Sequence, residues 1–239
     1  MNRPNVPPPD LDEKGAPVGG VPQTSSTRLF MQLQVFTGVR QTDALVSALE
    51  KSELPGVLYE DLLDPRGVGL LSWDEDPGYF ISRIRPLLNS EPFAELVHRP
   101  EMTMTGRTYA LGHEPDLQDW LLEKPVLTAS NRQWPWAIFY PLRRSGEFEQ
   151  LKQDEQRRIL MEHGRIGMSY AAGDYAHDIR LACHGMDRND NDFVIGLVGQ
   201  SLHPLSAVVQ SMRKTVQTSR FLESLGPFFV GHALWQAEF

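Results

Sequence analysis

Apolar and polar positions alternate where the folded part of the chain begins. Every odd position from residue 29 to residue 35 is apolar, which predicts a β-strand with one fully apolar face. Farther on, apolar residues recur at helical spacing or in short runs between turn residues. The segments predicted for this half are a strand at 29–36, a helix at 40–52, strands at 57–62 and 68–73, a helix at 77–97 that breaks near Pro92, and a strand at 102–111.

The second half of the chain repeats this order of elements. Its predicted segments are a strand at 134–142, a helix at 148–163, strands at 175–184 and 192–199, a helix at 203–221 and a strand at 227–234. Strand, helix, strand, strand, helix, strand is the order of a ferredoxin-like unit. We therefore predict an α+β fold of two tandem ferredoxin-like (βαββαβ) halves, whose antiparallel sheets merge into one β-barrel with the helices outside. The same periodicity is also compatible with an open α+β sandwich.

The N-terminal stretch differs from both halves in composition. Residues 1–26 are rich in Pro and Gly and poor in apolar residues. Burial of so little apolar surface cannot offset the entropy lost on ordering, so we predict a flexible arm. The N-terminal half then covers residues 27–125, with residues 116–125 in the connector, and the C-terminal half covers residues 126–239.

Charge and composition narrow the classes of function. The 239 residues are 41% apolar and carry a formal net charge of -8, so a buried core is expected and a nucleic-acid partner is not. An anionic ligand therefore has to be held by a local cluster of Arg or Lys. No apolar run reaches the roughly 20 residues of a membrane span and no signal-peptide core is present, so we expect no membrane insertion and a cytoplasmic location. Cys183 is the one cysteine, which excludes an intrachain disulfide and a Cys-x-x-Cys-His haem attachment.

Motifs in the second half carry a resemblance to a known family. The predicted strand contains Phe-Tyr-Pro-Leu-Arg-Arg at residues 139–144, and the next helix contains Glu155, an Arg pair at 157–158 and Glu-His-Gly at 162–164. Residues 226–231 read Gly-Pro-Phe-Phe-Val-Gly. Together these motifs resemble the chlorite dismutase-like superfamily, particularly its coproheme decarboxylase branch. Leu142, where the family commonly has Met, and Gln156, inserted before the Arg pair, are departures from its pattern.

The resemblance implies roles for individual residues. His163 would be the proximal ligand of an iron porphyrin, because a neutral imidazole nitrogen donates to iron; the alternative is a core histidine. Tyr140 would be the redox-active residue; the alternative is an aromatic side chain that fills the barrel. Arg144 stands where the family has a Lys that contacts a propionate, and a guanidinium matches a carboxylate in bidentate geometry. Further candidate anchors are Arg132, Arg143, Arg220 and Thr218, where Thr218 aligns approximately with a family Ser and each Arg also fits a solvated surface charge.

The resemblance also implies an activity, namely the peroxide-dependent oxidative decarboxylation of iron coproporphyrin III (coproheme) to haem b. Tyr140 would lose an electron and a proton, and the resulting radical would abstract hydrogen from a propionate side chain. Coproheme would be both substrate and cofactor, with hydrogen peroxide as the oxidant. The family assembles as rings, commonly pentamers, which implies a homo-oligomer.

The residues expected on the opposite side of the iron from His163 match the family less closely. Chlorite dismutases place an Arg thirteen residues after the proximal His, and firmicute decarboxylases place a Gln there; in this chain the position holds Ala176. A preceding loop longer by two residues would make Asp178 the equivalent, and His177 and Arg180 are further candidates. The absence of Arg at either aligned position argues against chlorite decomposition, whereas Tyr140 argues for decarboxylation.

Other functions stay open at this point. The chain is also compatible with a chlorite dismutase or weak peroxidase, with a haem-binding protein without turnover, and with a ferredoxin-like module that binds no cofactor. It contains no Gly-rich phosphate loop, zinc-ligand spacing or Gly-x-Ser-x-Gly elbow. No carboxylate partner for the His163 imidazole stands out in the sequence.

Overall fold

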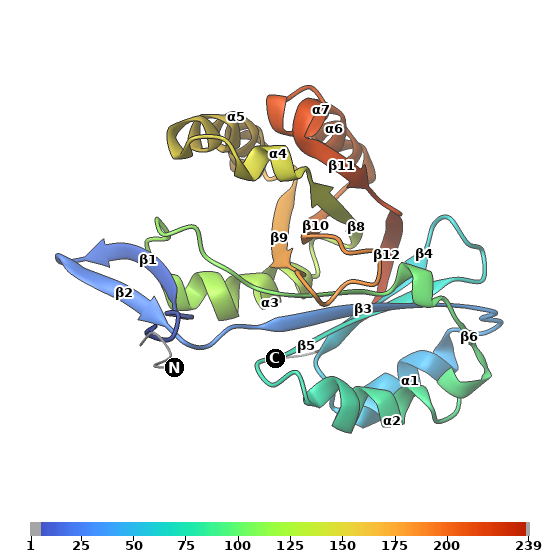
Figure 1. The fold of residues 1–239 in the computed structure, drawn as a ribbon. Helices are drawn as coiled ribbons and strands as arrows, with labels where there is room; N and C mark the ends of the chain where they lie inside the picture. Colours follow the sequence, from blue (N-terminus) through green and yellow to red (C-terminus); the bar gives the residue numbers. More distant parts are fainter. Residues whose placement is uncertain (1–5, 238–239) are drawn as a thin grey trace, which may run out of the picture.

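The computed structural model describes residues 6–237, so residues 1–5 of the predicted arm lie outside the described part. The first half contains β3 (Phe30–Thr37), α1 (Asp43–Ser52), β4 (Gly56–Asp61), β5 (Val68–Asp74), the short helices η1 (Phe80–Ile84), α2 (Arg85–Leu88) and η2 (Phe93–Glu95), then β6 (Val97–His98), η3 (Pro100–Met102) and β7 (Met104–Arg107) (Figure 1). The predicted order of strand, helix, strand, strand, helix, strand is confirmed here, with the short β6 added.

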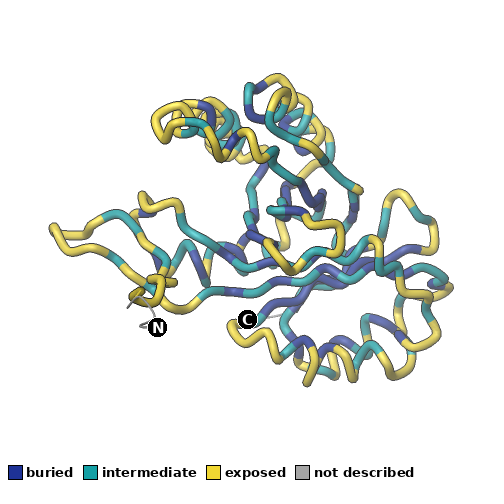
Figure 2. Tube along the Cα trace, in the orientation of Figure 1, coloured by how far each residue is buried: buried dark blue, intermediate teal, exposed yellow. Residues whose placement is uncertain are grey.

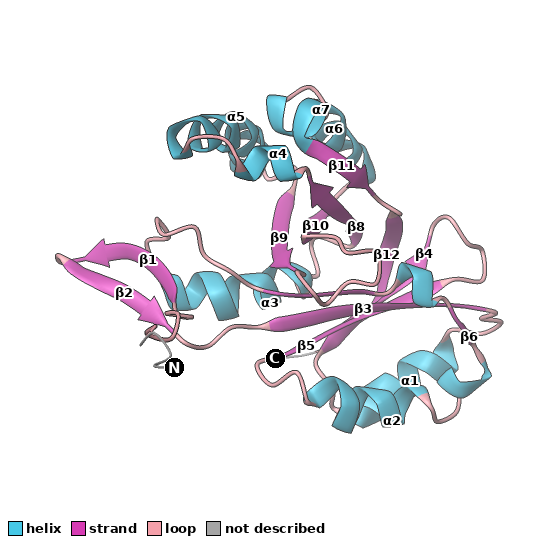
Figure 3. Ribbon diagram, in the orientation of Figure 1, coloured by secondary structure: helices cyan, strands magenta, loops and turns pink. Residues whose placement is uncertain are grey.

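The second half repeats this order (Figure 3). It contains η4 (Asp119–Glu123), α3 (Lys124–Ala129), β8 (Trp136–Arg144), α4 (Gly146–Glu149), α5 (Gln153–Ala172), β9 (His177–Ala182), β10 (Phe193–Gly199), α6 (Leu202–Met212), α7 (Val216–Phe221), β11 (Leu222–Leu225) and β12 (Phe229–Gln236). The α+β class is therefore confirmed.

One large antiparallel sheet joins the two halves. Its strands are hydrogen-bonded in the order β10-β9-β7-β3-β5-β4-β12-β8-β11, and β6 pairs with β3. Because β10 also pairs with β8, the strand pairing forms a ring. The contact between β7 and β9 is a single register pair, Arg107 with Ala182, whereas β12 and β4 pair from Gly231 to Gln236.

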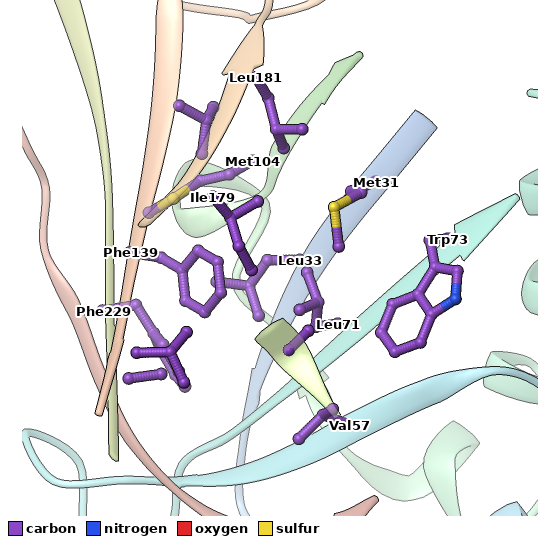
Figure 4. Close-up of a cluster of buried hydrophobic side chains, with 14 of the residues drawn as sticks. Met31, Leu33, Val57, Leu71, Trp73, Met104, Phe139, Ile179, Leu181 and Phe229 are labelled. Atoms are coloured by element: carbon purple, nitrogen blue, oxygen red, sulfur yellow. The ribbon is translucent and has the colours of Figure 1, made fainter. Parts of the chain in front are cut away.

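Apolar side chains from both halves meet on one face of this sheet. Met31 and Leu33 of β3 and Leu71 of β5 belong to the same buried cluster as Phe139 of β8 and Phe229 of β12 (Figure 4). Each of these five residues is at most 2% exposed. Burial of this face explains the alternation in β3, because successive side chains of a strand project to opposite faces.

Two groups of helices, α1 with α2 and α4 to α7, cover the other face of the sheet, whereas Ala129 of α3 packs in the cluster with Phe139 (Figure 1). Leu45 and Leu49 of α1 pack in one cluster with Leu58 of β4. Leu205 and Val208 of α6 lie in another cluster with strand residues from β8 and β10. Figure 2 shows the resulting pattern, with buried positions along the strands and exposed positions on the outer sides of the helices.

The N-terminal arm contains a β-hairpin where the sequence predicted a flexible segment. β1 (Glu13–Val18) and β2 (Val21–Ser25) pair in antiparallel fashion, and two glycines at positive φ form the turn between them. The side-chain amide of Gln23 donates to the carbonyl of Glu114 and accepts from the backbone N–H of Leu117. These contacts are distant in sequence, so composition alone could not reveal the order in this stretch.

Several boundaries also differ from the prediction. The predicted connector is largely helical, as η4 and α3, and the helix predicted at 77–97 ends at Leu88 before a separate short turn. α5 continues to Ala172, well beyond the predicted end at residue 163. The helix predicted at 203–221 is divided at Thr215, whose hydroxyl accepts from the N–H of Thr218 and so begins a new helix. Within the described range, no helix combines the length and apolar character that crossing a membrane requires.

Candidate functional site

Tyr140, Ile195 and Arg180 stand in one row across β8, β10 and β9. Ile195 is the register partner of Tyr140 on one side and of Arg180 on the other. Directly opposed residues of antiparallel strands project to the same face, so these three side chains share one face of the sheet. Asp178 and Arg144 lie an even number of positions along β9 and β8 and project to this face too. We call the face defined by these five residues the site face.

Helices from the second half lie over the site face. Ile166 and Tyr170 of α5 and Met212 of α6 pack in the apolar cluster that contains Tyr140. His163 is on α5, one turn before Ile166 and Gly167, and so lies on the side of the helix that meets this cluster. The apolar residues of α5 therefore hold His163 toward the strands.

The His163 imidazole is half-buried between α5 and the start of α7. Its Nδ1 lies 3.2 Å from the Oγ1 of Thr215. Burial, and after it the positive charges of Arg180 and Arg144, lower the pKa of His163 from 6.5 to about 4. The ring is therefore neutral at neutral pH, which is the form in which an imidazole binds a metal.

Tyr140 is a buried phenol in the middle of β8. It is 7% exposed, and its ring lies against that of Phe228 with the centroids 4.8 Å apart. Burial, and next the negative charge of Asp178, raise the pKa of Tyr140, while Arg213 opposes this shift. The side chain is thus a protonated phenol held in an apolar cluster.

Arg144 presents a partly buried cation at the end of β8. Its guanidinium lies 4.4 Å from the ring centroid of Phe148 and 4.9 Å from that of Phe193. Nη1 is 3.5 Å from the carboxylate of the exposed Glu149, and the side chain is 16% exposed. The buried Nε has no hydrogen-bond partner among the described residues. One donor of the guanidinium therefore lacks a protein acceptor within the described part of the chain.

Arg180 is held on the site face by two neighbours. Its Nε contacts the carboxylate of Asp178, and its guanidinium lies 5.1 Å from the ring centroid of Trp120. A cavity of about 20 Å³, roughly the size of one water, is lined by these three residues among others. Aromatic stacking and ion pairing fix a guanidinium more firmly than a solvated surface position does.

Tyr109 is a second tyrosine at this site that the sequence analysis did not single out. Burial raises its pKa, and the charges of Arg180 and Arg144 act in the opposite direction. The indole N–H of Trp120 donates to its carbonyl. Tyr109 follows β7 outside the motifs that carry the resemblance, so no local signal in the sequence marks it.

The structure separates the four candidates for the opposite side of the iron. Asp178 and Arg180 project onto the site face. Ala176 is 4% exposed and packs in the apolar cluster with Tyr140. His177 projects to the other face, where its ring stacks on Trp134 at 3.6 Å. Asp178 and Arg180 are therefore the polar candidates at the site.

Two predicted anchors lie on α7. The backbone N–H of Thr218 is 3.4 Å from the Oγ1 of Thr215, which places Thr218 close to His163. Arg220 is exposed and lines an open groove of about 670 Å³ together with Arg157 and Arg165 of α5. Thr218 is thus beside the site, whereas Arg220 faces this groove.

The other two predicted anchors lie away from the site face. Arg132 is exposed in the turn before β8, at the opposite end of this strand from Arg144. Arg143 projects to the opposite side of β8, and its Nε donates to the carbonyl of Asp190 at 2.7 Å. Arg143 therefore fastens the β9–β10 connection.

Part of the site face is open to solvent. Ile195 lies in the middle of the sheet and is still partly exposed, and the side chains of Asp178 and Arg180 are 33% and 36% exposed. A Cβ at Gly164, next to His163, would meet no atom within 4 Å. Among residues 6–237, no group of three or more His, Cys, Asp or Glu gathers to hold a metal ion. A metal bound by His163 thus needs further ligands from a cofactor or water.

Two solved structures share this fold. A haem-binding protein from Thermus thermophilus is 18% identical, with a TM-score of 0.67, and the match covers 87% of this chain and 94% of that protein. A chlorite dismutase from Candidatus Nitrospira defluvii, solved with imidazole, is 13% identical with a TM-score of 0.67, covering 87% of this chain and 92% of that one. No curated protein sequence matches the chain.

The sequence itself matches a family model. The model described as chlorite dismutase aligns with residues 101–234, which is more than half of the 239 residues. The aligned part runs from η3, just before β7, into β12 and includes Tyr140, His163 and Arg180. The chain belongs to the chlorite dismutase family.

Proposed function

We propose that this protein is a haem-dependent oxidoreductase that converts coproheme to haem b by peroxide-dependent oxidative decarboxylation. The observation that carries the proposal is the presence of a buried tyrosine and a neutral histidine at one site. Burial lowers the pKa of His163 and raises that of Tyr140, and the charge of Asp178 acts on both groups. An oxidisable phenol beside an iron ligand is the arrangement that this chemistry needs.

The residues at the site fit an iron porphyrin. His163 is neutral and supplies one nitrogen ligand. Ile195 on the site face is partly exposed, and a Cβ at Gly164, the residue after His163 in α5, would meet no atom of the described residues within 4 Å. A glycine inside a helix costs about 1 kcal/mol relative to alanine, so Gly164 makes sense where a ligand approaches the helix closely.

Arginines account for the recognition of a porphyrin with several carboxylates. Arg144 offers a buried Nε without a partner, and Thr218 lies beside His163. A charge-assisted hydrogen bond from a guanidinium to a propionate would satisfy this nitrogen. We propose Arg144 as the main anchor and keep Thr218, Arg132 and Arg220 as further candidates.

The proposed reaction is balanced in atoms and electrons. Each propionate loses carbon dioxide and two hydrogens to become a vinyl group, and one hydrogen peroxide takes up these two hydrogens to give two waters. The bound iron porphyrin supplies the oxidising power when peroxide reacts with it. Tyr140 would give up an electron and its phenolic proton, and the radical would take one hydrogen atom from the propionate. The second electron and proton would leave the propionate together with carbon dioxide and would be consumed in the reduction of peroxide to water. The burial of Tyr140 shields its radical from water and from reductants in solution.

A second candidate function is supported by Arg180. The sequence argued against chlorite decomposition because no Arg stands at the aligned positions, yet Arg180 projects to the site face, held by Asp178 and Trp120. A fixed cation can stabilise a small oxyanion. Chlorite decomposition or a peroxidase activity is therefore the alternative, and oxygen release from chlorite tests it.

The proposed function is tested with purified protein loaded with iron coproporphyrin III. Hydrogen peroxide is added stepwise, and the porphyrin is identified by mass spectrometry. We expect two successive losses of carbon dioxide with two hydrogens, ending at haem b after two equivalents of peroxide. Bound but unaltered coproheme, with oxygen released from chlorite, would support the second candidate instead.

The assembly is a separate proposal. By analogy with the rings of the family, we propose that the protein forms a homo-oligomer, with a pentamer as the first expectation. Light scattering coupled to size-exclusion chromatography measures its mass in solution, and a monomer at micromolar concentration would contradict this proposal.

A further inference from the structure

The hydroxyl of Thr215 has four polar neighbours, of which two have a fixed hydrogen-bonding role. Its Oγ1 lies 2.8 Å from the carbonyl oxygen of Met212, which is only an acceptor. The backbone N–H of Thr218, which is only a donor, lies 3.4 Å away. The Nδ1 of His163 lies 3.2 Å away, and this nitrogen donates or accepts according to its tautomer. The Oγ1 of Thr218, which can donate or accept, lies 3.4 Å away, farther than the carbonyl of Met212 at 2.8 Å and the Nδ1 of His163 at 3.2 Å.

Counting hydrogens resolves the role of His163. A threonine hydroxyl has one hydrogen and two lone pairs. The short contact with Met212 uses the hydrogen, and the N–H of Thr218 points at one lone pair. The other lone pair is left for His163. Its Nδ1 must then carry a hydrogen, because two acceptors facing each other would repel.

No other side chain that acts on His163 offers an alternative acceptor at this distance. Arg180 and Arg144, which act on it most strongly after burial, are donors only. Glu162 and Asp178 also act on His163, but the Oε2 of Glu162 accepts from the backbone N–H of Val216 at 3.1 Å, and the carboxylate of Asp178 contacts the Nε of Arg180. Among the described residues, Thr215 is therefore the acceptor that Nδ1 reaches.

The geometry points to Thr215 as the positioning residue of His163, accepting a hydrogen bond from Nδ1–H and leaving Nε2 as the bare nitrogen that binds iron. This inference rests on the iron-ligand role proposed for His163 and does not depend on decarboxylation. The acceptor is a neutral hydroxyl rather than a carboxylate. The imidazole thus remains a neutral ligand, with less electron donation to iron than a carboxylate partner would induce.

The local structure keeps Thr215 in this position from two directions. Its own hydroxyl caps α7, and Glu162, the neighbour of His163, binds the first N–H of that helix. A helix of six residues gains its stability mainly from such contacts. The connection between α5 and α7 thus sets the distance between His163 and Thr215.

The first test uses the porphyrin-free protein. Nitrogen-15 NMR of the histidine rings distinguishes the two neutral tautomers at pH 7. We expect His163 to be in the Nδ1–H form, opposite to the form that free histidine prefers. An Nε2–H tautomer would overturn the inference, whatever activity the protein has.

The second test uses variants of the porphyrin-loaded protein. Thr215→Val removes the acceptor and is expected to lower the Fe–His stretching frequency in the resonance Raman spectrum of the ferrous protein and to weaken iron-porphyrin binding by about 10- to 100-fold. Thr215→Ser restores both values, and Thr215→Asp raises the frequency above that of the wild type because a charged acceptor withdraws the hydrogen more strongly.

A matched control separates positioning from a loosened helix. Glu162→Ala releases the start of α7 but leaves the hydroxyl of Thr215 in place, so the Fe–His frequency is expected to stay at the wild-type value. The same shift in Glu162→Ala and Thr215→Val, or no shift in either, would contradict the inference. Where Thr215→Val does not fold, the Fe–His frequencies of Thr215→Ser and Thr215→Asp are compared instead. A higher frequency in Thr215→Asp supports the inference, and equal frequencies contradict it.

Discussion

Tyr140 on β8 and His163 on α5 lie within electrostatic range of the same carboxylate, that of Asp178 on β9. Burial lowers the pKa of His163 and raises that of Tyr140, and the charge of Asp178 acts upward on both pKa values, against the shift of His163 and with that of Tyr140. Strand register gathers Tyr140, Asp178 and Arg180 on one face, and the packing of α5 adds the imidazole. The proposed iron ligand and the proposed radical residue thus share one charged environment.

Replacement of His163 tests the iron ligand. We expect His163→Ala to weaken iron-porphyrin binding by roughly 100-fold, because a metal–ligand bond is lost. Absorption titration measures the affinity, and added imidazole is expected to restore the ligated spectrum. His177→Ala is the matched control, since His177 stacks on Trp134 away from the site face. Equal losses in the two variants would argue against His163 as the ligand.

Replacement of Arg144 tests the recognition of propionates. Loss of a charge-assisted hydrogen bond worth about 1.5–3 kcal/mol predicts that Arg144→Gln weakens coproheme binding by roughly 10- to 150-fold. Arg143→Gln is the control, because Arg143 donates to the carbonyl of Asp190 on the opposite side of the strand. It is expected to leave the affinity unchanged. An unchanged affinity in Arg144→Gln would remove this residue from the set of anchors.

The environment of His163 predicts a pH dependence of the porphyrin-free protein. Its folded pKa of about 4 lies below its ordinary value of 6.5, so the unfolded chain binds the proton more readily between these values. The contribution of the neutral His163 to the free energy of unfolding is therefore present in full above pH 6.5. It falls as the pH drops toward 4, by at most about 3 kcal/mol.

Urea unfolding at pH 7 and pH 4.5 measures this effect. The wild type is expected to lose more stability between these two pH values than His163→Gln, because the glutamine side chain at position 163 does not titrate. Parallel losses in the two proteins would show that His163 is not held in its neutral form.

Gly164 is expected to lower the stability of α5 and to favour porphyrin binding. Gly164→Leu gains helix propensity of about 0.8–1 kcal/mol, so the porphyrin-free protein is expected to melt about 2–4 °C higher. The added side chain projects into space that no described residue fills, about 100° around α5 from His163, and porphyrin affinity is expected to fall where the ligand extends along this side of the helix. Gly146→Leu, at the exposed start of α4, is the control that leaves affinity unaltered. An affinity unaffected by Gly164→Leu would place the ligand elsewhere.

Local patterns in the sequence were sufficient for the order of elements in the two halves and for the motifs that contain Tyr140 and His163. The alternation in β3 follows from a face buried against Phe139 and Phe229, and strand period reports such burial directly. The motif around Tyr140 and the one ending in His163 led to the family that the sequence model establishes. Their roles in catalysis and ligation stay predictions.

Contacts between distant segments decided what the sequence did not reveal. Thr215 became visible as the partner of His163 only once α7 was seen to begin against α5. Arg180 reaches the site through the register of β9 with β10, and counting residues from His163 carries no information on register. The hairpin of the arm depends on Gln23 binding to residues beyond β7.

The most direct test of the central claim follows the porphyrin in the wild type, Tyr140→Phe and Tyr109→Phe. Each protein is loaded with iron coproporphyrin III, given two equivalents of hydrogen peroxide and analysed by mass spectrometry. The account predicts haem b from the wild type and from Tyr109→Phe, and bound but unaltered coproheme from Tyr140→Phe. Formation of haem b by Tyr140→Phe at the wild-type rate would contradict it.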